Sequence, residues 1–247
     1  MQTTGNTILI TGGSAGIGLA LAEKLMRQSN RVIACGRSAA RLDAARASLP
    51  DLHTLVCDLT DAEQRRALAE HVRANYPDLN VLVNNAGVQY THLDFGTGGA
   101  TNGCIGNEID TNLTALVCLT DDLLPVLRRQ PQAAVVNISS ALALVPRADL
   151  PVYCATKAAV HAFSLALRRQ LAATPVRVYE VLPPQVNTGL NPAANTSRAS
   201  AMSPAAVADA VLAGLARDRY EIKIGITGTL AAINRWLPGV AAALINR

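Results

Sequence analysis

The alternation of short, continuous apolar runs with helical patterns is the feature that most constrains the fold of this chain. Seven runs have the length and β-branched content of strands: TILIT (7–11), RVIACG (31–36), LHTLVC (52–57), NVLVN (80–84), AAVVNIS (133–139), VRVYEVL (176–182) and YEIKIG (220–225). The early and middle runs are continuous, which is typical of strands covered on both faces in a parallel sheet. Helical patterns between most runs therefore predict right-handed βαβ units.

This order of elements predicts an α/β protein with a single-domain Rossmann fold. We expect a doubly wound, seven-stranded parallel sheet with helices on both faces. No change of composition and no internal repeat divides residues 1–247, of which 50% are hydrophobic, enough for one large core.

Composition and charge exclude several classes of partner. The 22 basic and 18 acidic residues are scattered and leave a net charge of +4, so we expect no nucleic acid. The 5 cysteines form no CxxC and no His/Cys cluster, which predicts free thiols and no metal site. We find no basic, apolar leader at the N-terminus and no apolar stretch long enough to span a bilayer. These patterns favour a cytoplasmic protein without a transmembrane segment.

A glycine-rich turn follows the first strand directly. TGGSAGIG places Gly12, Gly16 and Gly18 between a strand and an amphipathic helix. Glycines allow the backbone to approach a pyrophosphate, and the helix N-terminus offers N–H groups and a positive dipole end to it. Many glycine-rich turns are ordinary loops, but the position between strand and helix predicts a dinucleotide site.

The end of the second strand decides between the two nicotinamide dinucleotides. NAD-binding turns place an acidic residue there for the ribose 2′-hydroxyl, whereas this chain has Gly36 followed by Arg37. A guanidinium can bind a 2′-phosphate with two hydrogen bonds. The alternative is a solvated arginine in a turn. We expect NADP(H) rather than NAD(H), with Arg41 one helical turn further along in a position to assist.

From here the chain resembles the classical short-chain dehydrogenase/reductase family over nearly its whole length. After TGGSAGIG come CDLT (57–60), NNAG (84–87), DTN (110–112), VNISS (136–140), YCATK (153–157) and LPPQVNT (182–188), in the family's order. VYCATKAA and PPQVNT resemble the subgroup of oxidoreductases linked by name to D-alanine esterification of teichoic acids.

The resemblance implies where the cofactor would lie. Asp58 would receive the adenine amino group, with Leu59 beside the ring, and residues 84–87 would line the ribose and stabilise the central strand. The implied cofactor contacts are Gly12, Ser14, Gly16, Ile17, Gly18, Arg37, Asp58, Leu59, Asn85, Ala86, Gly87, Tyr153, Lys157, Val186 and Thr188. One departure is Pro184, where the family most often has glycine; it changes the local backbone path beside the nicotinamide.

Tyr153 and Lys157 share one face of a helix in a stretch with few other polar residues. A phenol of pKa about 10 is a poor base at neutral pH, and stabilising its anion by about three units takes roughly 4 kcal/mol. A nearby ammonium and the positive nicotinamide ring act in that direction. The alternative is a surface pair. We expect Tyr153 to be the acid/base that exchanges a proton with a substrate oxygen, and Lys157 to lower its pKa and hold the nicotinamide ribose.

Two further catalytic residues rest mainly on the resemblance. Ser140 ends a strand at the carboxyl edge of the sheet, where ligands bind in doubly wound folds; the family pattern makes it, not Ser139, the residue that holds the substrate carbonyl. In the family, the position of Asn112 orders a water that connects the lysine to solvent; the alternative is a polar group inside a helix.

The expected activity is interconversion of a carbonyl and an alcohol by hydride transfer with NADP(H). A cofactor-binding sensor without catalysis is one alternative, although it has no need of Ser140, Tyr153 and Lys157 together. A nucleotide-sugar epimerase or dehydratase is the other, although such enzymes usually carry a C-terminal substrate domain that 247 residues can hardly contain.

The remaining segments bear on substrate and association. Segments 89–107 and 189–203 are expected to read the small carbonyl or alcohol substrate. Helices at 109–127 and 154–172 are apolar over more than one face, which favours a homodimer or homotetramer. The apolar tail 227–247, with Trp236, could extend that contact, cover the substrate loop or touch a membrane surface.

Overall fold

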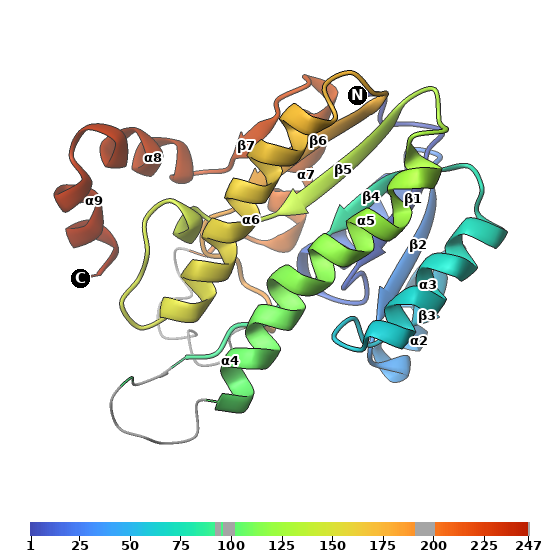
Figure 1. Cartoon of the computed structure of the whole chain (residues 1–247), viewed down its shortest axis with the longest axis horizontal. Helices are drawn as coiled ribbons and strands as arrows, with labels where there is room; N and C mark the ends of the chain where they lie inside the picture. Colours follow the sequence, from blue (N-terminus) through green and yellow to red (C-terminus); the bar gives the residue numbers. More distant parts are fainter. Residues whose placement is uncertain (92–94, 96–101, 191–200, 247) are drawn as a thin grey trace.

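The computed structural model describes residues 1–91, 95, 102–190 and 201–246 (Figure 1). The strands are β1 (Thr7–Thr11), β2 (Arg31–Gly36), β3 (His53–Val56), β4 (Leu79–Asn84), β5 (Ala133–Ile138), β6 (Val176–Leu182) and β7 (Glu221–Lys223). The helices are α1 (Gly16–Met26), α2 (Ala39–Ser48), α3 (Ala62–Asn75), α4 (Asn102–Ile109), α5 (Ala115–Leu127), α6 (Pro151–Gln170), α7 (Pro204–Ala216), α8 (Thr227–Trp236) and α9 (Pro238–Ile245). A π-helical turn (Asp110–Thr114) joins α4 to α5, and a 3-10 turn (Ala141–Ala143) follows β5.

The strands form one seven-stranded sheet in the order β3-β2-β1-β4-β5-β6-β7, and every pairing is parallel. The predicted doubly wound sheet is therefore confirmed. The chain reverses its direction of travel across the sheet between β1 and β4, which lie side by side. In such sheets ligands bind at this switch point, outside the carboxyl ends of the strands.

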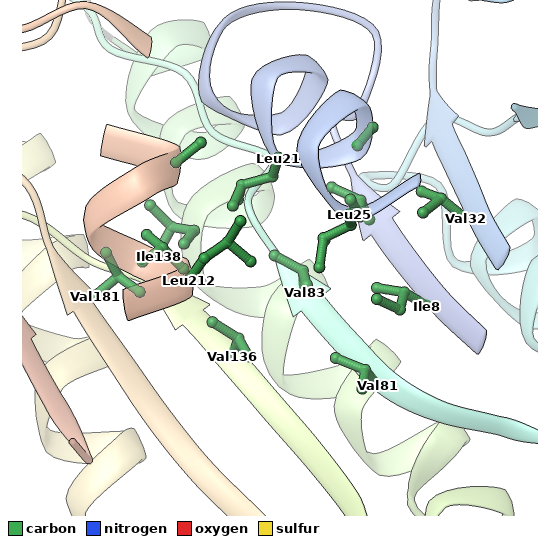
Figure 2. Packing of buried hydrophobic residues seen from close by; sticks show 14 of the residues in the cluster. Ile8, Leu21, Leu25, Val32, Val81, Val83, Val136, Ile138, Val181 and Leu212 are labelled. Carbon is green, nitrogen blue, oxygen red and sulfur yellow. The ribbon is translucent and has the colours of Figure 1, made fainter. Parts of the chain in front are cut away.

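Both faces of the sheet are covered, which explains the unbroken apolar runs. Along β1, Ile8 and Ile10 face one layer and Leu9 faces the other, as the alternation of a strand requires. Figure 2 shows the first layer, where Leu21 and Leu25 of α1 and Leu212 of α7 pack on the strands. The second layer packs α3, α5 and α6 against the opposite face. A sheet buried on both faces has no polar side to alternate with.

The two C-terminal helices stand at one end of the molecule, beyond β7 (Figure 1). They hold the segment between β5 and α6 through two asparagines. The Asn234 side-chain amide donates to the Leu144 carbonyl at 3.0 Å. The Asn246 side chain accepts from the Ala148 N–H at 2.7 Å and donates to the Pro146 carbonyl at 3.2 Å. Residues 144–148 are thus fixed by the end of the described chain.

The exposed apolar surface differs from the one expected. Among the described residues, the expected helix 109–127 exposes one large apolar side chain, Ile109, and 154–172 exposes none, whereas the C-terminal region carries Ile226, Trp236, Leu237, Val240 and Leu244. The reason is that the apolar side chains of α5 pack against one face of the sheet, while those of α6 pack partly there and partly against Leu142 and Leu150. No helix in the described ranges is both long and apolar enough to cross a membrane.

Candidate active site

The glycine turn after β1 is shaped by close backbone contacts. Gly12 and Gly16 have φ values of 65° and 54°, in the left-handed region that favours glycine. A Cβ on Gly18 would lie 2.4 Å from the Gly12 carbonyl oxygen, so only glycine fits there. Side chains cap α2 and α3, but the first-turn N–H groups of α1 have no side-chain cap. These N–H groups suit a phosphate, so the turn fits the predicted dinucleotide.

Thr11 joins this turn to the end of β4, a role that the sequence reading missed. Its hydroxyl accepts from the N–H groups of Asn85 and Ala86 at 2.9 and 3.0 Å. The Asn85 side-chain amide donates to the carbonyls of Thr11 and Gly12 at 2.9 and 3.2 Å. Asn85 therefore shapes the turn from the neighbouring strand. A threonine just before a glycine turn was the available signal.

The carboxyl end of β2 leaves room for a phosphate. Gly12 N donates to the Cys35 carbonyl at 2.8 Å, so the strand end lies beside the turn. A Cβ on Gly36 would find only the Ser14 hydroxyl nearby, at 3.6 Å. Arg37 and Arg41 are both exposed, and within the described ranges neither guanidinium forms an ion pair. Two unengaged cations next to an open strand end fit a 2′-phosphate.

The expected adenine end follows β3. The Asp58 carboxylate accepts from the N–H and hydroxyl of Thr60 at 2.9 and 2.8 Å, which fixes the turn. Leu59 is buried, and its carbonyl accepts from the buried guanidinium of Arg65 at 2.6 Å. Asp58 and Leu59 thus stand just beyond the carboxyl end of β3, and their contact with adenine stays a prediction.

Residues 84–87 divide into two roles. Asn84 is buried and its amide donates to Thr120 and Asn137, both at 2.9 Å, so it supports the sheet from within the core. Gly87 lies in the site: a Cβ there would be 3.2 Å from the Asn112 side-chain oxygen and 3.7 Å from the Lys157 amine. The expected ribose-lining role therefore suits residues 85–87, and Asn84 provides the strand support.

The segment after β6 closes the other side of the turn. Val186 pairs with Met202 as an isolated bridge. A Cβ on Gly16 would lie 3.1 Å from the Thr188 methyl, so Thr188 sits directly against the glycine turn. Most of the substrate-reading segments, residues 92–94, 96–101 and 191–200, lie outside the described residues.

The catalytic candidates converge between β5 and α6. β5 ends at Ile138, so Ser140 lies just beyond the strand and not at its end as expected, and its hydroxyl accepts from the Leu142 N–H at 3.1 Å. Lys157 is 4% exposed; its amine donates to the Ile138 carbonyl at 3.0 Å and lies 5.6 Å from the Tyr153 ring centre. Ser139 instead turns toward the α6 backbone, donating to the Lys157 carbonyl at 3.4 Å. The geometry thus favours Ser140 over Ser139.

Asn112 stands in the π-helical turn between α4 and α5. Its side chain accepts from the Val88 N–H at 2.8 Å and donates to the Val88 carbonyl at 2.9 Å and to the Thr156 hydroxyl at 3.2 Å. The buried side chain therefore links the segment after β4 to α6. Single π-helical turns often occur at functional sites.

The charges of this site are set mainly by burial. Burial raises the pKa of the Tyr153 phenol, a hydrogen bond from Ser140 lowers it, and the charges of Cys154 and Glu108 raise it. Burial lowers the pKa of Lys157 from 10.5 to about 8, while Glu108 and Glu180 raise it. The protein itself thus places the Tyr153 pKa above its ordinary value, opposite to the expected lowering. Burial of the phenol raises its pKa by more than the Lys157 ammonium, one helical turn away, lowers it.

Cys154 is packed against a neighbouring segment, and the sequence did not identify Glu108. The Cys154 thiol contacts the backbone of Arg147, and burial raises its pKa, which makes it unreactive. Glu108 is fully buried on α4, one helical turn before Asn112. A carboxylate at that spacing from Asn112 was the signal that could have identified it.

Comparison with known proteins gives a consistent picture. A family model described as short chain dehydrogenase matches residues 6–199. The chain is 54% identical over 191 residues to DltE, an uncharacterized oxidoreductase of Bacillus subtilis, covering 77% of this chain and 75% of that protein. It is 37% identical over 186 residues to a serine 3-dehydrogenase of Agrobacterium fabrum, covering 74% and 72%.

The fold comparison agrees. A short chain dehydrogenase of Burkholderia cenocepacia, solved in complex with NADP, superposes with a TM-score of 0.87 at 25% identity, covering 99% of each chain. The family expected from the motifs is therefore confirmed.

Proposed function

Since the chain belongs to the short-chain dehydrogenase family, and is thus an oxidoreductase that acts on CH–OH groups with NAD(P)(H), we propose that it uses NADP(H) to interconvert a small carbonyl compound and its alcohol. The observation that carries this proposal is the packing of Ser140, Tyr153 and Lys157 at the carboxyl end of β5, beside the glycine turn. A serine 3-dehydrogenase among the relatives supports a hydroxyl-bearing substrate.

The preference for NADP(H) rests on the end of β2. Gly36 brings no negative charge, and the guanidiniums of Arg37 and Arg41 are exposed and unengaged within the described ranges. The residues of the turn, of β2 and of segment 186–188 would hold the dinucleotide. When bound, it supplies or accepts the hydride, which is chemistry that no side chain provides. The NADP complex of the Burkholderia protein supports the same choice.

Tyr153 would exchange the proton at the substrate oxygen. In the reducing direction a neutral phenol donates its proton to the oxygen as the alcohol forms, and a raised pKa keeps it protonated. In the oxidising direction the phenolate must accept that proton, and the ammonium of Lys157 stabilises it. The pKa of Lys157, about 8, leaves it mainly charged at neutral pH.

Ser140 and Asn112 would support this transfer. The Ser140 hydroxyl lowers the pKa of the Tyr153 phenol, so the two hydroxyls are close enough that a substrate oxygen between them would meet two donors. Asn112 holds the Val88 backbone on one side and Thr156 of α6 on the other. It therefore keeps the lysine-bearing helix at a fixed distance from the segment after β4.

The test is a panel of aldehydes, ketones and keto acids assayed for NADPH and NADH oxidation at 340 nm. Turnover with NADPH that is lost in Tyr153→Phe supports the proposal. Tight NADPH binding without turnover on any carbonyl or alcohol points to a sensor. Conversion of a nucleotide sugar without net redox change points to an epimerase. The single domain, the cytoplasmic location and the homodimer or homotetramer stay predictions.

A further inference from the structure

Glu108 is a buried carboxylate that the mechanism above does not use. It is 0% exposed and lies on α4, one helical turn before Asn112. One carboxylate oxygen, Oε1, accepts from the Tyr90 N–H at 3.1 Å. The other, Oε2, has no hydrogen-bond partner among the described residues. A buried charge with an unpaired oxygen is costly, so it persists where it has another use.

The helix that carries Glu108 packs directly against the catalytic helix. α4 and the π-helical turn both contact α6. Asn112 and Glu108 hold successive parts of one segment, because Asn112 binds both backbone groups of Val88 and Glu108 binds the Tyr90 N–H. Both residues therefore lie along the same backbone, which passes the Lys157 amine at Gly87, where a Cβ would be 3.7 Å from that amine.

The ionisable groups around Glu108 come from three elements. Lys157 and Tyr153 stand on α6, which packs against α4, and the charge of Glu108 raises the pKa of both. Tyr90 lies on the segment after β4, where its hydroxyl is bound by Asn107. Cys104 and Asp110 belong to its own helical stretch. Burial raises the pKa of Glu108 itself, and the Tyr90 hydrogen bond and the Lys157 charge oppose that.

We propose that Glu108 is a positioning residue whose buried negative charge keeps Lys157 an ammonium and sets the pH range in which the Tyr153–Lys157 pair works. It acts through the pair and not on the substrate. The inference rests on the proposed function for its catalytic meaning, but its electrostatic part concerns this chain's residues alone. Without Glu108, desolvation of Lys157 would be opposed mainly by Glu180, which His161 already engages at 2.7 Å.

The direct test titrates Lys157 without any substrate. The lysines of the chain are Lys24, Lys157 and Lys223, so 13Cε-lysine NMR gives a spectrum that Lys157→Arg can assign. We expect Glu108→Gln, which keeps an acceptor for the Tyr90 N–H, to lower the Lys157 pKa from about 8 by about one unit, the size that a nearby opposite charge contributes. Glu108→Asp, which keeps the charge, should restore most of the wild-type value.

Two matched variants separate local charge from general effects. Glu63→Gln removes an equal charge from an exposed position on α3 and should leave the Lys157 titration unchanged. Glu180→Gln removes the other buried carboxylate that acts on Lys157 and should lower its pKa too. Glu180 is not among the charges that act on Tyr153, so its removal should not shift the tyrosine.

With a substrate in hand, the pH–rate profile gives the second readout. The pair titrates with two macroscopic pKa values, and loss of a negative neighbour lowers both. The whole profile of Glu108→Gln should therefore move to lower pH. An unchanged Lys157 titration in Glu108→Gln, with a lowered melting temperature, would make Glu108 a purely structural residue and overturn the proposal. A shifted Lys157 titration in a protein that turns over no substrate would support the role of Glu108 and contradict the proposed reaction.

Discussion

The two halves of this sheet form their parts of the site in opposite ways. Around β1 and β2 the site depends on residues without side chains, because a Cβ on Gly12, Gly16 or Gly18 would crowd the neighbouring atoms. Around β5 and α6 it is formed by the buried polar side chains of Ser140, Tyr153 and Lys157. We therefore expect the first half to fail when atoms are added and the second when atoms are removed.

The largest effect expected on removal is that of Tyr153→Phe. The substitution deletes one oxygen and leaves the ring packed with Leu150 and Cys154, so the fold should be kept. We expect kcat to fall by about 10³-fold or more, within or beyond the range of a lost acid/base. The dissociation constant for NADPH, measured by fluorescence titration, should change less than about twofold. Substantial turnover in the variant would remove Tyr153 from the mechanism.

Lys157→Met tests the same half through stability. Lys157 is buried and its pKa falls from 10.5 unfolded to about 8 folded, so its charged form destabilises the fold below pH 8. Between about pH 8 and 10.5 the unfolded chain holds a proton on Lys157 that the folded chain has released, so stability rises with pH across this range. At 1.36 kcal/mol per pKa unit this amounts to about 3 kcal/mol.

Urea unfolding at pH 7 and at pH 10.5 checks this. We expect Lys157→Met to be inactive, and its advantage in the free energy of unfolding over the wild type to shrink by about that amount at the higher pH. An advantage that is the same at both values would mean that Lys157 titrates normally.

Gly18→Ala tests the other half by adding one atom. The new Cβ would lie 2.4 Å from the Gly12 carbonyl oxygen, so the turn must shift. Such overpacking costs about 1–3 kcal/mol, and we expect weaker NADPH binding as the turn moves. Gly228→Ala is the matched control, because nothing lies within 4 Å of its Cβ position. Equal melting temperatures and NADPH affinities for the two variants would end the contrast between the halves.

Arg37→Ala is an exception to this contrast. It removes atoms from the half that contains the glycine turn, and we still expect binding there to weaken. A hydrogen bond to a charged group contributes about 1.5–3 kcal/mol, so NADPH binding should weaken by about tenfold or more. NADH binding should change little. Calorimetric titration with both dinucleotides measures this directly. Equal weakening of both would show that Arg37 does not recognise the 2′-phosphate.

Most of the fold was readable because both faces of the sheet are covered. A strand buried on both sides must be apolar at every position, as Ile8, Leu9 and Ile10 are, and such runs cannot be mistaken for amphipathic strands. Helix α4 was missed, because it lies largely in the stretch 89–107 that was expected only to read the substrate, and so were α8 and α9 in the apolar tail 227–247. Some boundaries also differed. α6 begins at Pro151, three residues before the expected start, because proline fits the first helical turn. β7 is Glu221–Lys223, shorter than expected, because it pairs on one side only.

The sequence predicted the site residues whose spacing along the chain indicates their chemistry. It did not predict those that come together only through contacts between distant elements. Tyr153 and Lys157 are neighbours on one helix. Glu108 meets them only because α4 packs on α6, and Thr11 meets Asn85 only because β1 pairs with β4. The raised pKa of Tyr153 also depends on its packing against Leu150 and Leu142, which no local pattern records.

The clamp of Asn234 and Asn246 on residues 144–148 has a kinetic consequence. The stretch between Ser140 and Tyr153 is closed by a partner 98 positions later in the chain. Contacts so distant in sequence must meet the entropy of loop closure before they contribute, and they form late in folding. The stretch between Ser140 and Tyr153 would therefore reach its final form only after the C-terminal helices have docked.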